Sequence, residues 1–128
     1  MQALQSIDRI IDGGRSLVRW RADARRTARS AIALTDQEVI FIVAAETRSL
    51  YGGDFDVRIA SPSGFGLPLW AFSQYVLGST GARQALNLDG ARSSQLAARI
   101  GGKKFRVRAV GGTVNAVVLR PASGTSSP

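Results

Sequence analysis

The sequence of 128 residues contains neither cysteine nor histidine. Their absence excludes disulfides, thiolate nucleophiles, zinc sites of the ordinary kind and histidine-based catalytic triads. Long apolar runs are absent too: the longest, residues 39–45, falls well short of the ~20 residues that cross a bilayer. We therefore expect no membrane span, and any chemistry must use carboxylates, hydroxyls, amides, guanidinium groups or the backbone.

Acidic residues are scarce. Lysine and arginine number 17 against 9 aspartates and glutamates, which gives a net charge of +8. Residues 57–128 contain a single acid, Asp89. Such a surface attracts phosphates, nucleic acid, anionic glycans or acidic lipid. A solvated basic face that only promotes solubility is the alternative interpretation.

The apolar fraction of 45 % is typical of a globular domain, which we expect over residues 1–121, with a disordered tail at 122–128. Short apolar segments separated by Gly and Asp predict an α+β fold: a mixed or mainly antiparallel sheet with one main helix packed on it. The helix is expected at residues 67–77, with Pro68 in its first turn and Gly78 ending it. Extended segments are expected at residues 3–11, 30–34, 38–45, 55–60, 84–88, 95–100, 104–107 and 114–119.

Two stretches allow more than one interpretation. Thr35-Asp36-Gln37 favours a hairpin turn, although Thr35 and Glu38 also match a helical capping box. The β-branched and aromatic run that follows predicts a central strand buried on both faces. Earlier in the chain, residues 17–21 alternate like a strand, while residues 22–28 have helical propensity.

Asp89 follows a predicted buried strand and precedes a glycine turn and two hydroxyls, Ser93 and Ser94. A carboxylate in this setting binds a sugar hydroxyl, acts as an acid or base, or holds a cation. In the alternative interpretation, Asp89 only caps its own loop in an Asx-turn.

The segment QALNLDGARSSQL at residues 84–96 resembles the signature of the phosphodiester glycosidase family, in which a strand leads into N-L-D-G-G and then S-S or S-T. Weaker matches to family motifs occur in the same order along the chain, at residues 2–13, 25–32, 38–44, 67–77 and 114–118. The resemblance covers residues 2–120 and corresponds to the C-terminal half of the family domain. It also implies an exported or periplasmic location, although Met1 is not followed by the pattern of a signal peptide.

The resemblance implies a glycosidase-like domain that hydrolyses or binds sugar-1-phosphodiesters of the N-acetylglucosamine-1-phosphate type, with no cofactor and no metal. Asp89 would be the catalytic carboxylate, because a carboxylate stabilises an oxocarbenium-like state. Arg26 would bind the phosphate, since a guanidinium is a forked partner for it. The substrate-binding positions implied by the family are Arg26, Thr27, Asn87, Gly90, Ser93, Ser94 and Asn115. The alternatives are that Arg26 is simply solvated and that Asn115 only satisfies backbone groups.

The sequence departs from the family pattern at Ala91, where the second glycine is expected, and at Arg29 and Ser30, which interrupt the R-R-T-A-I-G motif. No recognisable motif marks a second carboxylate. The candidates for it are Asp8, Asp12, Asp36, Glu38, Glu46, Asp54 and Asp56. A shortened domain would expose sheet edges, which predicts a homo-oligomer or a partner chain.

Two further functions remain open. One is a non-enzymatic basic module that binds nucleic acid or another polyanion, although the sequence shows no nucleic-acid-binding signature and no aromatic stacking platform. The other is a structural subunit completed by self-assembly. The salt dependence of binding distinguishes a polyanion-binding module from a glycosidase, because polyanion binding weakens steeply with salt whereas a single phosphodiester contact weakens gently.

Overall fold

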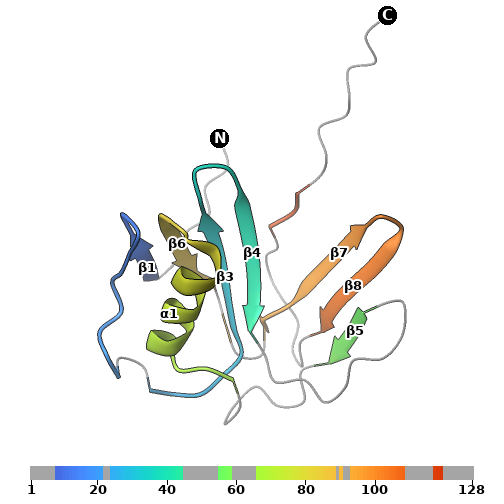
Figure 1. The fold of residues 1–128 in the computed structure, drawn as a ribbon. Helices are drawn as coiled ribbons and strands as arrows, with labels where there is room; N and C mark the ends of the chain where they lie inside the picture. The colour runs from blue at the N-terminus through green and yellow to red at the C-terminus, as the bar shows by residue number, and fades with distance from the viewer. Residues whose placement is uncertain are drawn as a thin grey trace, which may run out of the picture.

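The computed structural model describes residues 8–21, 24–44, 55–58, 66–88, 90, 93–108 and 117–119. Their regular elements are β1 (Asp8–Asp12), β2 (Arg15–Ser16), β3 (Arg29–Leu34), β4 (Val39–Ala44), β5 (Phe55–Arg58), α1 (Leu69–Thr80), β6 (Gln84–Asn87), β7 (Leu96–Ile100) and β8 (Lys103–Arg108). The strands form a five-stranded sheet, ordered β2-β1-β6-β3-β4, and a three-stranded sheet, ordered β5-β8-β7. Figure 1 shows α1 against the larger sheet, with the smaller sheet standing apart on the β4 side. The predicted α+β class is confirmed.

Strand β6, which leads into Asp89, is the centre of the larger sheet, a position that was expected for residues 39–43. It pairs antiparallel with β1 on one side and with β3 on the other, so that Asn87 lies between Asp8 and Ala31. Two residues earlier, Ala85 lies between Ile11 and Ala33. Because alternate residues of a strand share one face, all these positions lie on the same side of the sheet.

Helix α1 covers that side of the sheet. Alanines at positions 31, 33 and 85 present little bulk, which allows the helix to approach closely while Phe72 and Val76 fill the space between. Both of these helical side chains are fully buried, and full burial of such a side chain contributes about 1.5–3 kcal/mol. The buried core consists of Ile10, Ile11, Ala31, Ala33, Leu69, Phe72, Val76, Ala82 and Ala85.

A buried serine fixes the helix to β1. Pairing between β1 and β6 is irregular between Arg9 and Ile11, and the carbonyl of Ile10 in this stretch accepts two hydrogen bonds. Ser73 Oγ donates to that oxygen over 3.3 Å, and Leu17 N donates to it over 3.0 Å. Ser73 also shares a hydrogen bond with Ser16 Oγ. The fully buried hydroxyl is therefore satisfied, and it joins α1 to both β1 and β2.

The limits of α1 differ from the prediction. Pro68 is the N-cap, and the helix runs through Gly78 to Thr80. Gly81 ends it with φ 64, and its N–H donates to Leu77 O over 3.0 Å. The prediction that Gly78 ends the helix is therefore wrong, because the left-handed residue that closes a helix is three positions later.

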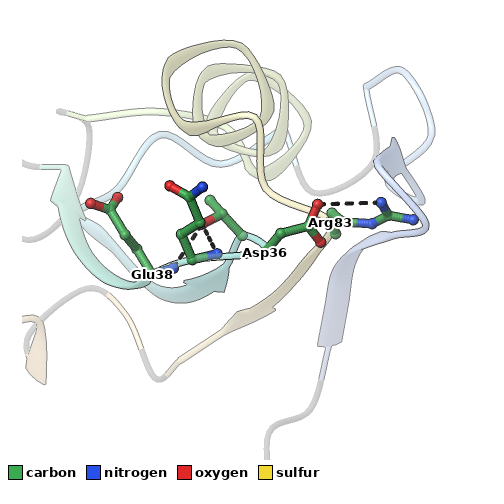
Figure 2. Close-up of polar contacts among 5 residues, drawn as sticks. Asp36, Glu38 and Arg83 are labelled. Carbon is green, nitrogen blue, oxygen red and sulfur yellow. Dashed lines mark hydrogen bonds and ion pairs between the residues drawn. The ribbon is translucent and has the colours of Figure 1, made fainter.

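The predicted hairpin of β3 and β4 is confirmed, with antiparallel pairing from Arg29↔Ala44 to Leu34↔Val39. Figure 2 shows its turn: Thr35 Oγ1 accepts from Gln37 N over 3.2 Å and from Glu38 N over 2.9 Å. A helical capping box uses the same hydroxyl-to-backbone contact, which explains why the sequence fits both interpretations. The exposed pair Arg83–Asp36, at 3.6 Å, joins the turn to the residue before β6.

Strand β4 is not central and is not buried on both faces, contrary to the prediction. Among the described strands it forms an edge of the larger sheet, and Val39 is 49 % exposed. Only alternate residues, Ile40, Ile42 and Ala44, pack against the core beneath α1. A β-branched run indicates a strand, whereas its place in the sheet depends on pairing with distant segments.

The smaller sheet combines β7 and β8, an antiparallel pair joined at Gly101–Gly102, with β5 parallel to β8. Strands were expected at all three places.

The C-terminal predictions fare differently. Residues 117–119 are exposed and lie outside any strand, so the expected strand at 114–119 is not found in its described part. The domain end at residue 121 and the tail at 122–128 lie outside the described residues. Within the described ranges, no helix combines the length and apolarity needed to cross a bilayer.

The segment between β2 and β3 forms neither of the expected elements where it is described. Residues 17–21 and 24–28 contain no helix or strand, apart from an isolated bridge between Thr27 and Leu67. Residues 17–21 instead reach the helix, where Val18 packs on the core and Trp20 meets Trp70.

Candidate functional site

The end of β6 meets the start of β3, and this meeting positions the N-L-D-G segment. Leu88 N donates to Ser30 O over 2.8 Å, which extends the pairing beyond the last strand residue of β6. Gly90 approaches the same segment so closely that a Cβ there would lie 3.1 Å from Ala28 O. Asp89 is outside the described residues, and its two chain neighbours are both held against residues 28–30.

Residues 27–29 also contact the segment that enters α1. Leu67 N donates to Thr27 O over 3.1 Å, in an isolated bridge. Gly66 has φ 103, and a Cβ there would lie 2.2 Å from Thr27 O. The backbone at Thr27–Ala28 therefore connects the end of β6 with the N-terminal end of the helix.

Arg26 and Thr27 were expected on a strand beside β6, but they lie just before β3, the neighbour of β6, and outside any strand apart from the isolated bridge of Thr27 to Leu67. The Arg26 side chain is exposed, and its Nε donates to Gly66 O over 3.3 Å. That bond uses one of the five N–H donors of a guanidinium. Arg26 is thus positioned by the loop before α1, with its terminal nitrogens directed to no other described group.

Sequence reasoning missed Arg29, which it treated as an interruption of a motif. The residue is only 6 % exposed, although arginine is seldom fully buried. Its Nε donates to Leu67 O over 3.1 Å and its Nη2 to Arg25 O over 3.0 Å. Because Arg29 precedes Ala31 by two residues on β3, it lies on the same face as Asn87 and fixes the loop backbone there.

The two serines after Gly90 differ in their surroundings. Ser93 closes a tight turn, since its backbone N and its Oγ both approach Gly90 O, over 3.3 and 2.9 Å. Ser94 is 1 % exposed, and among the residues that the structure describes its Oγ has no hydrogen-bond partner. An unsatisfied buried hydroxyl costs about 1–3 kcal/mol, so Ser94 carries unused capacity to bind a polar group.

Asp8 is the described carboxylate nearest in register to this end of β6, because it pairs directly with Asn87. Both residues lie on the face that α1 covers further along the sheet. Two other candidates for a second carboxylate pair with arginines at the opposite end of the strands: Asp12 with Arg9 at 3.4 Å and Asp36 with Arg83 at 3.6 Å. The described residues contain no group of three or more potential metal-binding side chains.

The structure therefore brings Arg26, Thr27, Asn87 and Gly90 to one region, around the backbone of residues 27–30. Ser93 belongs to this region through its bonds to Gly90. Asp89 and Asn115 lie outside the described residues, and their predicted roles stay predictions.

An aromatic pair lies near the same end of α1. The rings of Trp20 and Trp70 have centroids 4.0 Å apart at an interplanar angle of 48°, and Trp20 is 70 % exposed. This corrects the expectation that the basic segments lack an aromatic platform. No local signal predicts the pair, because it forms only when the loop after β2 reaches the first turn of the helix.

The sheet, the helix and the loop after β6 define an α+β domain with a polar site at the end of its central strand. A family model described as phosphodiester glycosidase matches residues 1–124 of this chain. The chain belongs to that family, and the resemblance inferred from its motifs is confirmed. No curated protein and no solved structure matches it.

Proposed function

We propose that this domain hydrolyses sugar-1-phosphodiesters of the N-acetylglucosamine-1-phosphate type in the loop that follows β6. The observation that carries the proposal is the contact of Leu88 and Gly90 with residues 28–30, beside Arg26. This contact assembles family motifs that are about sixty residues apart in the chain. Membership of the phosphodiester glycosidase family supports the same chemistry.

Arg26 is proposed to bind the phosphate. Its exposed guanidinium has N–H groups beyond the one that donates to Gly66, and the phosphodiester carries one negative charge. The N-terminal end of α1 lies alongside, because Leu67 bridges Thr27. That helix has no side-chain cap and no acidic residue in its first turn, so the nearby backbone favours an anion.

Asp89 is proposed to stabilise the positive charge that develops on the anomeric carbon during the reaction. The bond between the anomeric carbon and the phosphate oxygen breaks, and the phosphate monoester leaves with the bonding electrons. Water then adds to the oxocarbenium-like carbon and loses a proton, while the carboxylate stabilises the positive charge. Asp8, opposite Asn87 in the sheet, is the proposed second carboxylate that accepts this proton. Asn87 and Ser94 supply polar groups for sugar hydroxyls.

The test is release of free sugar from an α-N-acetylglucosamine-1-phosphate ester. We expect Asp89→Asn to lower the rate by at least about a hundredfold, as for loss of a group that stabilises transition-state charge. Asp36→Asn is the matched control, because Asp36 is an exposed aspartate whose ion pair lies at the opposite end of the strands. Circular dichroism should show both variants folded. Full activity in a folded Asp89→Asn variant would remove this residue from the mechanism.

Polyanion binding is the second candidate function, and one observation favours it. Arg99 pairs with Lys104 across β7 and β8, and Arg106 follows on the same face, all three exposed. Asp56 of β5 lies in register with Arg106, and the concentration of positive charge on this face is what a polyanion would bind. This function predicts that the affinity for an oligonucleotide falls steeply between low and moderate salt.

Self-association of the domain stays a prediction, and the measurement that tests it is the mass of the protein in solution.

A further inference from the structure

The Trp20–Trp70 pair has no role in the core or in the site described above. Trp20 is 70 % exposed, so the pair does not serve mainly to bury apolar surface. Tilted rings with centroids 4.0 Å apart hold each other in place and leave most of Trp20 open to solvent. Exposed aromatic surface that is held in one orientation is typical of a binding site.

We propose that Trp20 and Trp70 form a stacking subsite for a sugar ring of a phosphodiester-linked glycan, next to the sugar whose bond is cleaved. This inference rests on the proposed hydrolysis of sugar-1-phosphodiesters and names its substrate as a chain of sugars rather than a small diester. An indole face is electron-rich, while the C–H groups on one face of a pyranose carry partial positive charge. The two surfaces therefore match in shape and polarity.

The position of the pair supports this assignment. Trp70 lies in the first turn of α1, three residues after Leu67, which bridges Thr27. Arg26 donates to Gly66, immediately before Leu67. The aromatic pair and the proposed phosphate ligand thus belong to the same end of the helix. A glycan with its phosphate on Arg26 would place a neighbouring sugar near the rings.

The charge around Trp20 favours an anionic glycan over a neutral one. Arg19 and Arg21 flank Trp20 in the chain, and both are exposed. Within the described residues neither takes part in an ion pair. Arg21 also has φ 62, a conformation that non-glycine residues rarely adopt. These two arginines add positive charge to the segment that carries Trp20, and this charge complements phosphates along a chain.

The experiment measures binding and hydrolysis separately with Trp20→Ala. The binding probes are a phosphodiester-linked oligomer of N-acetylglucosamine-1-phosphate, a neutral N-acetylglucosamine oligomer and a single-stranded oligodeoxynucleotide of equal charge. Tyr75→Ala is the matched control, since Tyr75 is another exposed aromatic residue on α1 but is not part of the pair. Trp20→Phe keeps a ring, and it should retain most of the affinity.

We expect Trp20→Ala to bind the charged oligomer about tenfold more weakly, and to weaken further the already weak binding of the neutral one, because both offer sugar C–H groups to the ring. It should cleave a monosaccharide-1-phosphate ester at the wild-type rate. Tyr75→Ala should match the wild type throughout. Unchanged affinity of folded Trp20→Ala for the charged oligomer overturns the subsite, even when hydrolysis persists. Tighter binding of the oligonucleotide than of the oligomer, lost in Trp20→Ala, also overturns it and assigns the rings to nucleic acid.

The subsite and the hydrolysis fail independently. A wild-type protein that releases no sugar, but binds the charged oligomer in a Trp20-dependent way, retains the subsite and loses the proposed reaction. A wild-type protein that cleaves the small ester, with oligomer binding indifferent to Trp20, retains the reaction and loses the subsite.

Discussion

The two sheets of this domain are stabilised in different ways. Every residue of the buried core lies in the larger sheet or in α1, except Ala82, which is the second residue after the helix. In β7 and β8 of the smaller sheet, each described side chain is exposed or half-buried. No described element of the smaller sheet packs extensively on α1 or on the larger sheet. Apolar burial beneath the helix thus stabilises one region, whereas the other depends on strand pairing.

Charge is distributed differently as well. The hairpin of β7 and β8 contains five basic residues and no acid: Arg99, Lys103, Lys104, Arg106 and Arg108. In the larger sheet, ion pairs of Arg9 with Asp12 and of Arg83 with Asp36 offset part of the positive charge. On β5, Asp56 lies in register with Arg106 and is the one acid in the described strands of the smaller sheet. The comparison therefore separates a region stabilised by apolar burial from a basic region stabilised mainly by strand pairing.

The largest expected effect comes from removing the helical side chain at the centre of the core. Phe72→Ala deletes a fully buried ring above the alanines of β3 and β6, and such changes cost about 3–5 kcal/mol. The free energy of unfolding from urea denaturation is the measurement. Tyr75→Ala, on the exposed side of the same helix, should change it by less than about 0.5 kcal/mol. Equal effects of the two variants would contradict the helix-covered core.

The next largest effect tests the junction between the core and the candidate site. Gly66→Ala forces a Cβ to within 2.2 Å of a backbone oxygen at φ 103, and the strained conformation alone costs about 1–3 kcal/mol. We expect lower stability together with slower sugar release, because Arg26 donates to this residue. Gly14→Ala is the control: its φ is also positive, at 73, but its Cβ meets nothing within 4 Å. A Gly66→Ala variant no less stable than Gly14→Ala would show that the close approach to Thr27 is unimportant.

Local patterns predicted the elements well and their placement poorly. The β3–β4 hairpin, the strand before Asp89 and the helix follow from turn residues and apolar spacing, which act over a few neighbours. The edge position of β4 did not follow, because strand order arises from pairing between distant segments. The strong strand propensity of β4 does not imply burial on both faces, because a strand covered by a helix on one face needs only alternate apolar residues.

The same limit applies to the candidate site. Motif order grouped Arg26 and Thr27 with the end of β6, because the family pattern carries long-range information that spacing alone does not, and the structure places both just before β3 rather than on it. Arg29 was missed because burial of a guanidinium depends on carbonyls from two loops, at Arg25 and Leu67. The Trp20–Trp70 pair was missed for a similar reason, as it joins a loop to a helix fifty residues later.

Two glycines, Gly78 inside α1 and Gly81 at its C-cap, test where the helix ends. Gly78 lies inside the helix with nothing within 4 Å of an added Cβ, so Gly78→Ala should stabilise the domain by about 0.5–1 kcal/mol. Gly81→Ala should destabilise it by about 1 kcal/mol, because φ 64 at the C-cap disfavours a side chain. Thermal denaturation of the two variants checks the opposite signs. Destabilisation by Gly78→Ala would mean that the helix ends there after all.

The smallest effect is expected from a substitution in the smaller sheet. Arg99→Glu places a carboxylate opposite Lys104, which turns repulsion into attraction and stabilises the hairpin by about 0.2–1 kcal/mol at low salt. Arg19→Glu is the control, with the same change in net charge at an exposed position outside the strands. Hydrogen exchange of amides in β7 and β8 is the measurement, because a local gain in a weakly packed region need not alter global unfolding. Slower exchange confined to this hairpin supports two regions of separate stability. Equal slowing at the amides of β3 and β6 would show that the two sheets open together, and the distinction between them would then fail.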